Sequence, residues 1–432
     1  MNTDNKKKMG LWMSTSLVIG NMIGAGIFLM PSALAAYGGI SIIGWIFSAA
    51  GAILLAKIFS NLSVLVPNKS GGPYIYSKIG FGDFAAFLVA WGYWISIWVA
   101  NAAIAIAFVG ALSVFLPILE ENKVWAVVVG LGAIWFLTWI NSRGVRASGK
   151  MQLITTTLKL VPLVLIIIGG FFFFNWDHFS PFNLSGASTF SAISITAAMT
   201  LYAYMGVESA TIPAVSIENP EKNIPKATMI GTIITAMVYI LSTVMIMGMI
   251  PPDALSKSPA PFADAMEIIS GEWGKDMVAF GAAIAAFGAL NGWILVQGQI
   301  AMSIAKDNLF PTLFKKENKN GVPIMGLVVG SILTSIVMLM NYTDGLVDQF
   351  KFLILLTALC VLIPYLFSSA AYVLIKMQRK NGATKWIPII ALGGLAFAYS
   401  LWAVYGAGEK AVFWGFLLLL AGIPLYVWMK RR

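Results

Sequence analysis

The hydrophobic and polar positions of this chain form long apolar segments separated by short polar ones. A helix needs about 20 residues to cross the hydrocarbon core of a bilayer, and most of these segments reach or exceed that length. The pattern predicts twelve membrane-spanning helices and no separate soluble domain. The predicted spans cover residues 11–36, 40–66, 84–116, 124–142, 151–174, 191–215, 227–250, 276–304, 323–341, 346–375, 386–406 and 411–429.

Composition agrees with an all-α polytopic membrane protein. Of the 432 residues, 59% are hydrophobic and 11% are charged, which leaves too little polar side chain to cover a soluble surface. The longest polar stretches, residues 175–190 and 251–276, are predicted to carry short helices at the membrane interface. The single cysteine, Cys360, lies in an apolar run and the single histidine, His178, lies in a loop. Neither suggests a metal site, and no cofactor or metal ion is expected.

The positive charges are distributed unevenly between the two sides of the predicted membrane. The net charge of +10 could indicate nucleic-acid binding, but 21 of the 28 lysines and arginines fall in segments on the same side as the N-terminus. Only 4 fall in the opposite loops. By the positive-inside rule, this asymmetry places both termini in the cytoplasm. The charge therefore indicates orientation in a lipid bilayer, and no nucleic-acid partner is expected.

The first apolar segment contains the stretch GNMIGAGIFLMP, with small residues at its centre. In hydrocarbon every backbone N–H and C=O must be paired, so an unwound stretch is tolerated only where it is buried or lines a cavity. Two interpretations are open. Gly24, Ala25 and Gly26 either allow close helix packing or leave backbone groups free for a ligand. In the second case, N–H groups at the start of a second half-helix would favour a carboxylate.

A second segment, GVESATIP at residues 206–213, resembles GAGIFLMP at residues 24–31, because each begins with glycine and ends with proline at the same spacing. The offset between them spans five helices, so the second copy enters the membrane in the opposite sense. We therefore predict an inverted repeat with two interrupted helices, as in transporters that bind substrate between such breaks. The predicted parts are a cytoplasmic tail (1–10), a first repeat (11–174), a second repeat (191–375), two further spans (386–429) and a cytoplasmic end (430–432).

Two charged residues lie inside predicted spans, where an unpaired charge is costly. Glu208 lies in the second glycine-containing segment, and Lys159 lies in the fifth span. Glu208 is either a protonated structural acid or a carboxylate that attracts a cationic substrate group or carries a proton. Lys159 either extends to the interface or is a buried ammonium that replaces a coupling cation and exchanges a proton.

Two further residues are candidates for contact with a ligand. Asn101 is a polar residue in the middle of the third span, where it could bond to a ligand amine or to a broken helix. Trp293 lies beside Gly292 in the middle of the eighth span. Its indole N–H needs a partner, and its ring face can stack on a guanidinium or an ammonium.

Several stretches together resemble the amino acid–polyamine–organocation (APC) transporters, and most of all the bacterial basic amino acid and polyamine antiporters. They are GNMIGAGIFLMPSALAAYGG, SGGPYIYSKIGFG, MTLYAYMGVESATIPAVSIENPEKNIPKAT, STVMIMGMIP, APFADA, LNGWILVQGQ and DNLFPTLF. The resemblance covers nearly the whole chain. It implies the APC fold, with a five-plus-five inverted repeat, broken first and sixth helices, and two appended helices. It also implies a multi-pass protein of the bacterial cytoplasmic membrane that is often a homodimer.

The same resemblance implies where substrate binds. The substrate carboxylate would lie on the first interruption and its amino group on the second, with side chains of spans 3, 8 and 10 around the remainder. Glu208 and Lys159 would be the proton-coupling residues, and Tyr93 matches a gating tyrosine. The implied substrate-binding residues are Met22, Gly24, Ala25, Gly26, Ser96, Ile97, Asn101, Tyr202, Met205, Trp293 and Thr357.

Three residues depart from the pattern of the arginine exchangers. Ala25 occupies a position where the arginine exchangers have a serine. Tyr202 occupies a position where they have a tryptophan that stacks on the guanidinium. Lys159 resembles the lysine that replaces a sodium ion in other branches. Two functions therefore stay open: a sodium-independent transporter of cationic amino acids or amines, by exchange or proton coupling, or a broad neutral amino acid–proton symporter. A nutrient sensor on a transporter fold is a third hypothesis. An enzyme is not expected, because one loop histidine and an isolated acid do not provide catalytic groups.

Overall fold

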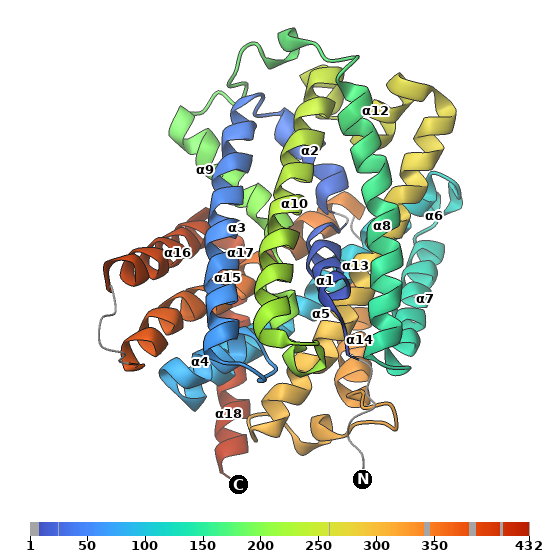
Figure 1. The fold of residues 1–432 in the computed structure, drawn as a ribbon. Coiled ribbons are helices and arrows are strands. Elements are labelled where there is room, and N and C mark those ends of the chain that lie inside the picture. Colours follow the sequence, from blue (N-terminus) through green and yellow to red (C-terminus); the bar gives the residue numbers. More distant parts are fainter. Residues whose placement is uncertain are drawn as a thin grey trace.

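The structure is a computed structural model, and it describes residues 8–24, 26–258, 260–340, 346–379, 386–406 and 409–431. It is a bundle of long helices (Figure 1). Over the described ranges the regular structure is helical, apart from one isolated parallel bridge between Met9 and Ile217. The all-α class predicted from the sequence is therefore confirmed.

The helices follow the apolar segments of the sequence. They are α1 (Leu11–Met22), α2 (Gly26–Ala35), α3 (Ile40–Leu65), α4 (Pro73–Phe81), α5 (Asp83–Ser113), α6 (Ile118–Glu121), α7 (Lys123–Ser142), α8 (Val145–Gly170), α9 (Thr189–Leu201), α10 (Pro220–Met249), α11 (Pro252–Leu255), α12 (Pro261–Ser270), α13 (Glu272–Lys306), α14 (Ile324–Met340), α15 (Leu346–Gln378), α16 (Trp386–Gly406), α17 (Glu409–Leu420) and α18 (Gly422–Lys430). Among the described residues, ten helical segments are long and apolar enough to cross a membrane, which supports a multi-pass membrane protein. The other two predicted spans correspond to the divided α1–α2 pair and to the shorter α14.

Some helix boundaries differ from the hydrophobic pattern. Helix α10 begins at Pro220, before the predicted start at residue 227, and α8 begins before residue 151. The physical reason is that hydropathy marks the apolar part of a helix, whereas the helix itself begins at its cap. In α10 a proline in the first turn starts the helix, since its fixed φ suits that position. The predicted short helices in the polar stretches are present as η1 (Trp176–Phe179), α11 and α12.

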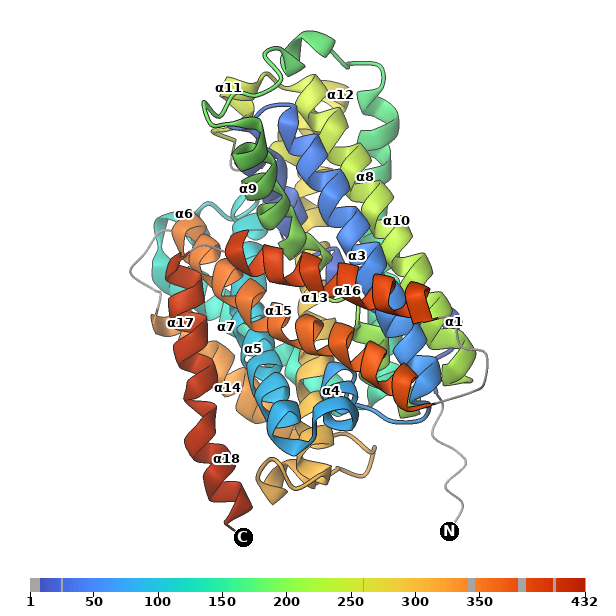
Figure 2. The same cartoon turned by 90° about the vertical axis from the view of Figure 1, so that its left-hand side faces the viewer.

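Helices α5 and α13 form the centre of the bundle. The apolar window of α13 is 78% buried, whereas that of the last segment, Val412–Lys430, is 17% buried. Helix α13 packs against α1, α5, α7 and α8. Figure 2 shows α16 beside α15, and α17 and α18 following one another along the flank. The central helices are therefore the ones placed to form a site.

The two described chain ends lie on the same side of the bundle (Figure 1 and Figure 2). On this side the Met9 N–H donates to the Ser216 carbonyl, and the Glu218 N–H donates to the Met9 carbonyl, each at 2.9 Å. In the loop before α4, the Gly71 N–H donates to the Ile212 carbonyl at 3.0 Å. The segment after α9 is thus bound to the N-terminal residues and to the α3–α4 loop.

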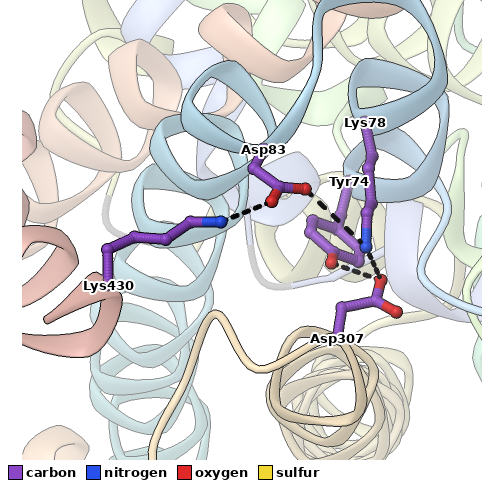
Figure 3. A network of polar contacts seen from close by, with 5 residues as sticks. All are labelled: Tyr74, Lys78, Asp83, Asp307 and Lys430. Carbon is purple, nitrogen blue, oxygen red and sulfur yellow. Dashed lines mark hydrogen bonds and ion pairs between the residues drawn. The ribbon is translucent and has the colours of Figure 1, made fainter. Parts of the chain in front are cut away.

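Five side chains form a polar network on this side, which we call the rim network: Tyr74, Lys78, Asp83, Asp307 and Lys430 (Figure 3). Lys78 Nζ lies 2.9 Å from Asp307 Oδ2, and Lys430 Nζ lies 2.7 Å from Asp83 Oδ2. The Tyr74 hydroxyl donates to Asp307 Oδ2 at 2.5 Å. Burial, and then this hydrogen bond, raise the pKa of Tyr74 above its usual value, so the hydroxyl stays protonated. The network joins α4, α5, α18 and the end of α13.

Candidate functional site

A cavity inside the bundle is lined by the first glycine-containing segment, by residues just before the second, and by α5, α13 and α15. Seven of the predicted residues line it: Met22, Gly24, Ser96, Tyr202, Met205, Trp293 and Thr357. Its walls also include Asn21, Ile27, Ala100, Ile104, Ala203 and Val361. None of these described lining residues carries a charged side chain, so the cavity offers backbone groups, an amide, hydroxyls, thioethers and aromatic rings.

The first interruption separates α1 from α2. Helix α1 ends at Met22, and Ile23 leaves helical geometry with φ −75° and ψ 83°. Helix α2 begins at Gly26. The break therefore lies where the small residues predict it. Ala25, a predicted substrate-binding residue, lies outside the described residues.

The last carbonyls of α1 are paired with side chains from other helices. A helix end leaves its final carbonyls without intrahelical partners. Here Trp293 Nε1 donates to the Asn21 carbonyl at 3.1 Å, and the Tyr239 hydroxyl donates to the Met22 carbonyl at 2.5 Å. These two carbonyls are thus paired within the protein, because α10 and α13 pack closely enough to reach them.

Lys159 completes this arrangement from α8. Its Nζ lies 2.7 Å from the Gly20 carbonyl oxygen and 2.5 Å from that of Ile23. The side chain is 0% exposed, so it does not extend to the surface. An ammonium is favourable at a helix C-terminus, where the helix dipole is negative. In the described part of the chain no carboxylate forms an ion pair with it.

The second interruption follows α9 and lies against the first. Gly206 has φ +105°, and a Cβ added there would lie 3.2 Å from both Asn21 and Trp293. Both the conformation and the space therefore favour glycine. Asn21 Nδ2 donates to Ser209 Oγ at 2.9 Å, which joins the two interruptions directly. After α9 the chain continues through the 3-10 turns η2 (Tyr202–Tyr204), η3 (Ser209–Thr211) and η4 (Ala214–Ser216).

Glu208 binds two tyrosines. Its Oε1 accepts from the Tyr93 hydroxyl at 2.5 Å, and its Oε2 accepts from the Tyr365 hydroxyl at 2.6 Å. The residue is 0% exposed and is not part of the cavity lining. Its carboxyl group therefore joins the second interruption to α5 and α15.

Comparison with known families identifies this architecture. The chain matches the family described as Amino acid permease over residues 9–427. It belongs to the amino acid permease family. This confirms the resemblance to APC transporters seen in the sequence motifs.

Named relatives align with this permease over nearly its full length. The arginine/ornithine antiporter of Pseudomonas aeruginosa is 32% identical, over 100% of this chain and 93% of the relative. The putrescine transporter PotE of Escherichia coli (strain K12) is 34% identical, over 100% of this chain and 98% of the relative. The arginine/agmatine antiporter of Chlamydia pneumoniae is 30% identical, over 98% and 90%.

Besides Glu208 and Lys159, three described residues among those predicted, Ile97, Asn101 and Tyr93, do not line the cavity. Asn101 is fully buried, and its Nδ2 donates to Gln297 Oε1 at 3.0 Å. Ile97 is buried in the core. Tyr93 is bonded to Glu208. Asn101 is therefore bonded to a side chain of α13.

Sequence reasoning missed several residues of the site. Asn21 lines the cavity, Tyr239 and Tyr365 bind the interrupted segments, and Gln297 holds Asn101. Asn21 precedes the small residues by only three positions, which was a usable signal. The two tyrosines gave no comparable signal, because tyrosines in apolar spans are commonly packing residues.

Proposed function

We propose that this permease is a sodium-independent transporter of cationic amino acids or amines, such as arginine, agmatine or polyamines, and that it works by exchange or with proton coupling. The relatives that align over the full chain are named as antiporters of arginine with ornithine or agmatine, or as a putrescine transporter. The cavity between the two interruptions supports the same class of substrate, since it offers acceptors and ring faces.

One observation carries the sodium-independent part of the proposal. The Lys159 ammonium is bound to the Gly20 and Ile23 carbonyls at the end of α1. Carbonyl oxygens are typical ligands of an alkali cation, and a fixed ammonium there replaces such a cation by charge and by position. A proton that leaves or joins Lys159 would change the charge beside the cavity, and Glu208 would be the second proton-coupling group.

A broad neutral amino acid–proton symporter is the alternative. It is favoured by the uncharged cavity lining and by Tyr202 in place of a stacking tryptophan. Ala25 would also remove one hydroxyl contact to an arginine-type substrate. A nutrient sensor on the same fold would bind substrate without moving it.

We also infer the full architecture implied by the sequence motifs. The permease would have twelve spans, with repeats at residues 11–174 and 191–375 and two appended spans at 386–429. Residues 1–10 and 430–432 would face the cytoplasm of a bacterial inner membrane, in agreement with the distribution of positive charge. The two described chain ends lie on one side of the bundle (Figure 1), as an even number of spans requires. We also propose that the permease forms a homodimer.

Transport by purified protein in proteoliposomes tests the function. Uptake of labelled arginine, agmatine and putrescine should require internal cationic substrate or a pH gradient, and it should be unchanged when sodium is replaced by choline. Uptake of alanine and methionine should be much slower. Sodium-dependent uptake would contradict the proposal. Proton-driven uptake of alanine without amine transport would establish the alternative, and binding without movement would establish the sensor.

A further inference from the structure

One face of α8 is polar on one side of Lys159 and apolar on the other. Toward the start of the helix, this face continues with Thr156 and Gln152, three and seven residues earlier, and both side chains are buried. Toward the end of the helix, the same face continues with Leu163 and Ile166, which are both 0% exposed. Polar surface therefore leads away from Lys159 along α8 in one direction only.

This direction leads to the side of the bundle that holds the described chain ends. Helix α8 begins at Val145. A Cβ added at Gly149 would lie 3.4 Å from Met9 Sδ and 3.7 Å from Met13 Sδ, so the start of α8 lies beside the N-terminal residues. In the proposed orientation, this is the cytoplasmic side of the membrane.

Four buried amide side chains lie next to this face of α8, and we call them the amide cluster: Asn21, Asn141, Gln152 and Asn291. Asn291 Nδ2 donates to Gln152 Oε1 at 3.3 Å. Asn141 Nδ2 donates to Asn291 Oδ1 at 3.0 Å. Asn141 is the second-last residue of α7, so the cluster extends from α8 through α13 to the end of α7.

Two glycines bring the amide cluster close to the first interruption. A Cβ added at Gly292 would lie 1.9 Å from Asn21 Oδ1 and 3.0 Å from Gln152 Oε1. A Cβ added at Gly20 would lie 1.7 Å from Gln152 Nε2. The Gly20 carbonyl is itself an acceptor of the Lys159 ammonium. Gln152 therefore lies between the surroundings of Lys159 and the rest of the cluster.

Three atoms of the amide cluster have no hydrogen-bond partner among the described residues. They are Asn21 Oδ1, Asn141 Oδ1 and Gln152 Nε2, and their side chains are at most 4% exposed. Burying a polar group without a partner is costly, and ordered water normally binds such groups inside proteins. Water is both a donor and an acceptor, so it suits a cluster that presents two acceptors and one donor.

We propose that the amide cluster and the polar face of α8 bind water molecules through which Lys159 exchanges its proton with the cytoplasm. The inference rests on the proposed function and names the route of the proton. In the outgoing step, an N–H bond of the ammonium breaks and an O–H bond forms on a bound water, which passes a proton to the next water. Lys159 stays a neutral amine until the reverse step restores the ammonium. Gln152, Asn291 and Thr156 are positioning residues, because they orient these waters.

The helices packed most extensively against α8 place no charged group beside Lys159. These helices are α1, α7, α10, α12 and α13, and their described charged residues lie in α12 or within two turns of a helix end. Helix α12 contacts α8 near Gly169, ten residues beyond Lys159, where an added Cβ would lie 2.8 Å from Ile269. The titratable Tyr239 of α10 donates its hydroxyl hydrogen to the Met22 carbonyl. Water is therefore the proton acceptor that this environment favours.

Proton movement into proteoliposomes tests the role of Gln152. A pH-sensitive dye inside the vesicles reports protons that move when labelled arginine is added, and the same vesicles report arginine transport. Gln152→Leu removes the amide at similar volume and should lower the ratio of proton movement to arginine transport about tenfold, since the waters lose a partner. Asn291→Leu should act in the same direction. A loss of active protein alone would lower both rates and leave the ratio unchanged.

Thr156 and Thr157 form a matched pair on α8. Thr156 Oγ1 is buried and donates to the Ser16 carbonyl at 3.2 Å. Thr157 is exposed, and its Oγ1 donates to the Leu153 carbonyl at 3.0 Å. Thr156→Val should lower the same ratio, whereas Thr157→Val should leave it unchanged.

Thiol labelling tests the route without transport. Cys360 is the only cysteine of the chain, so Gln152→Cys in a Cys360→Ser background is the single thiol. A charged methanethiosulfonate that does not cross membranes should modify Gln152→Cys from the cytoplasmic side and not from the outer side. Thr157→Cys, on the exposed face of the same helix, should stay unmodified from both sides because it faces lipid.

The outcomes separate this inference from the proposed function. An unchanged ratio in Gln152→Leu, Asn291→Leu and Thr156→Val would overturn the inference and leave the proposed function standing, as would Gln152→Cys that stays unmodified from the cytoplasmic side. Wild-type transport of arginine without proton movement would also overturn the inference, while cationic transport would stand. Wild-type protein that transports no cationic substrate would overturn the proposed function itself, and the labelling of Gln152→Cys would still decide the inference. If Gln152→Leu fails to fold, Thr156→Val and the labelling decide it.

Discussion

Lys159 and Glu208 differ from the rim network in the groups that neutralise their charge. Lys159 binds backbone carbonyls and Glu208 binds tyrosine hydroxyls, and both residues are 0% exposed. In the rim network, lysines pair directly with aspartates, and these side chains remain 27–48% exposed. Neutral dipoles stabilise the charges of Lys159 and Glu208, whereas opposite charges stabilise those of the rim network.

This difference follows from desolvation. Burying a full ion pair requires removal of water from both charges, which the attraction between them often fails to offset. A single buried charge surrounded by oriented dipoles avoids the second desolvation, and its protonation is not tied to the charge of a partner. Water screens the exposed pairs, which are typically worth about 0–1 kcal/mol. We therefore expect central substitutions to alter transport strongly and rim substitutions to alter it little.

The largest expected effect is that of Lys159→Met. Methionine keeps much of the volume but leaves the Gly20 and Ile23 carbonyls without their donor, at about 1–3 kcal/mol each. Exchange in proteoliposomes should fall at least about 100-fold, since the end of α1 beside the cavity loses its support. Lys57→Met is the matched control, because Lys57 is an exposed lysine in α3. An equal loss of exchange rate in Lys159→Met and Lys57→Met would contradict a specific role for Lys159.

Glu208→Gln should have the next largest effect. Glutamine offers one acceptor oxygen where the carboxylate offers two, so either Tyr93 or Tyr365 loses the acceptor of its hydroxyl hydrogen. We expect about a tenfold slower exchange, with a flatter dependence on pH. Initial rates measured from pH 5 to pH 8 check this, with the exposed Glu272→Gln as control. Unchanged rates and an unchanged pH profile would contradict a coupling role for Glu208.

Tyr239→Phe tests a neutral partner of the first interruption. The substitution removes the donor to the Met22 carbonyl, which still accepts from the Gly24 N–H at 2.8 Å. The free energy of unfolding should fall by about 0.5–1.5 kcal/mol, the usual net value of one hydrogen bond. Thermal unfolding in detergent measures this loss as a lower midpoint. Tyr204→Phe is a close control, because the buried Tyr204 hydroxyl has no hydrogen-bond partner among the described residues and its ring packs against Tyr239.

Lys430→Ala should have the smallest effect. Its pair with Asp83 is half exposed, so its removal should cost at most about 1 kcal/mol and less at high salt. Exchange should stay within about twofold of wild type. Asp307→Ala should cost more than Lys430→Ala, because it removes the acceptor of the buried Tyr74 hydroxyl as well as an ion pair. If Lys430→Ala slowed exchange more than Lys159→Met, the expectation that central substitutions matter more than rim substitutions would be wrong.

Much of the site could be predicted from the sequence because its signals are local. The small residues before Gly26 predicted the break after Met22, and the glycine at position 206 predicted the second interruption. The family motifs added residues of the cavity wall such as Ser96 and Thr357. The bond between Asn101 and Gln297 could not be predicted, because Gln297 lies on a helix far along the chain; the contact of Asn101 with a ligand stays a prediction.

The sequence by itself determined the all-helical membrane class, the positions of the interruptions and the presence of two charges within apolar spans. These depend on hydropathy and on backbone freedom, which each segment carries alone. Only the tertiary structure decided how those charges and carbonyls are paired. Lys159 is 136 residues from Ile23, and Tyr365 is 157 residues from Glu208. Such partners meet only when helices pack, because a hydrogen bond depends on distance and direction between atoms that local sequence does not specify.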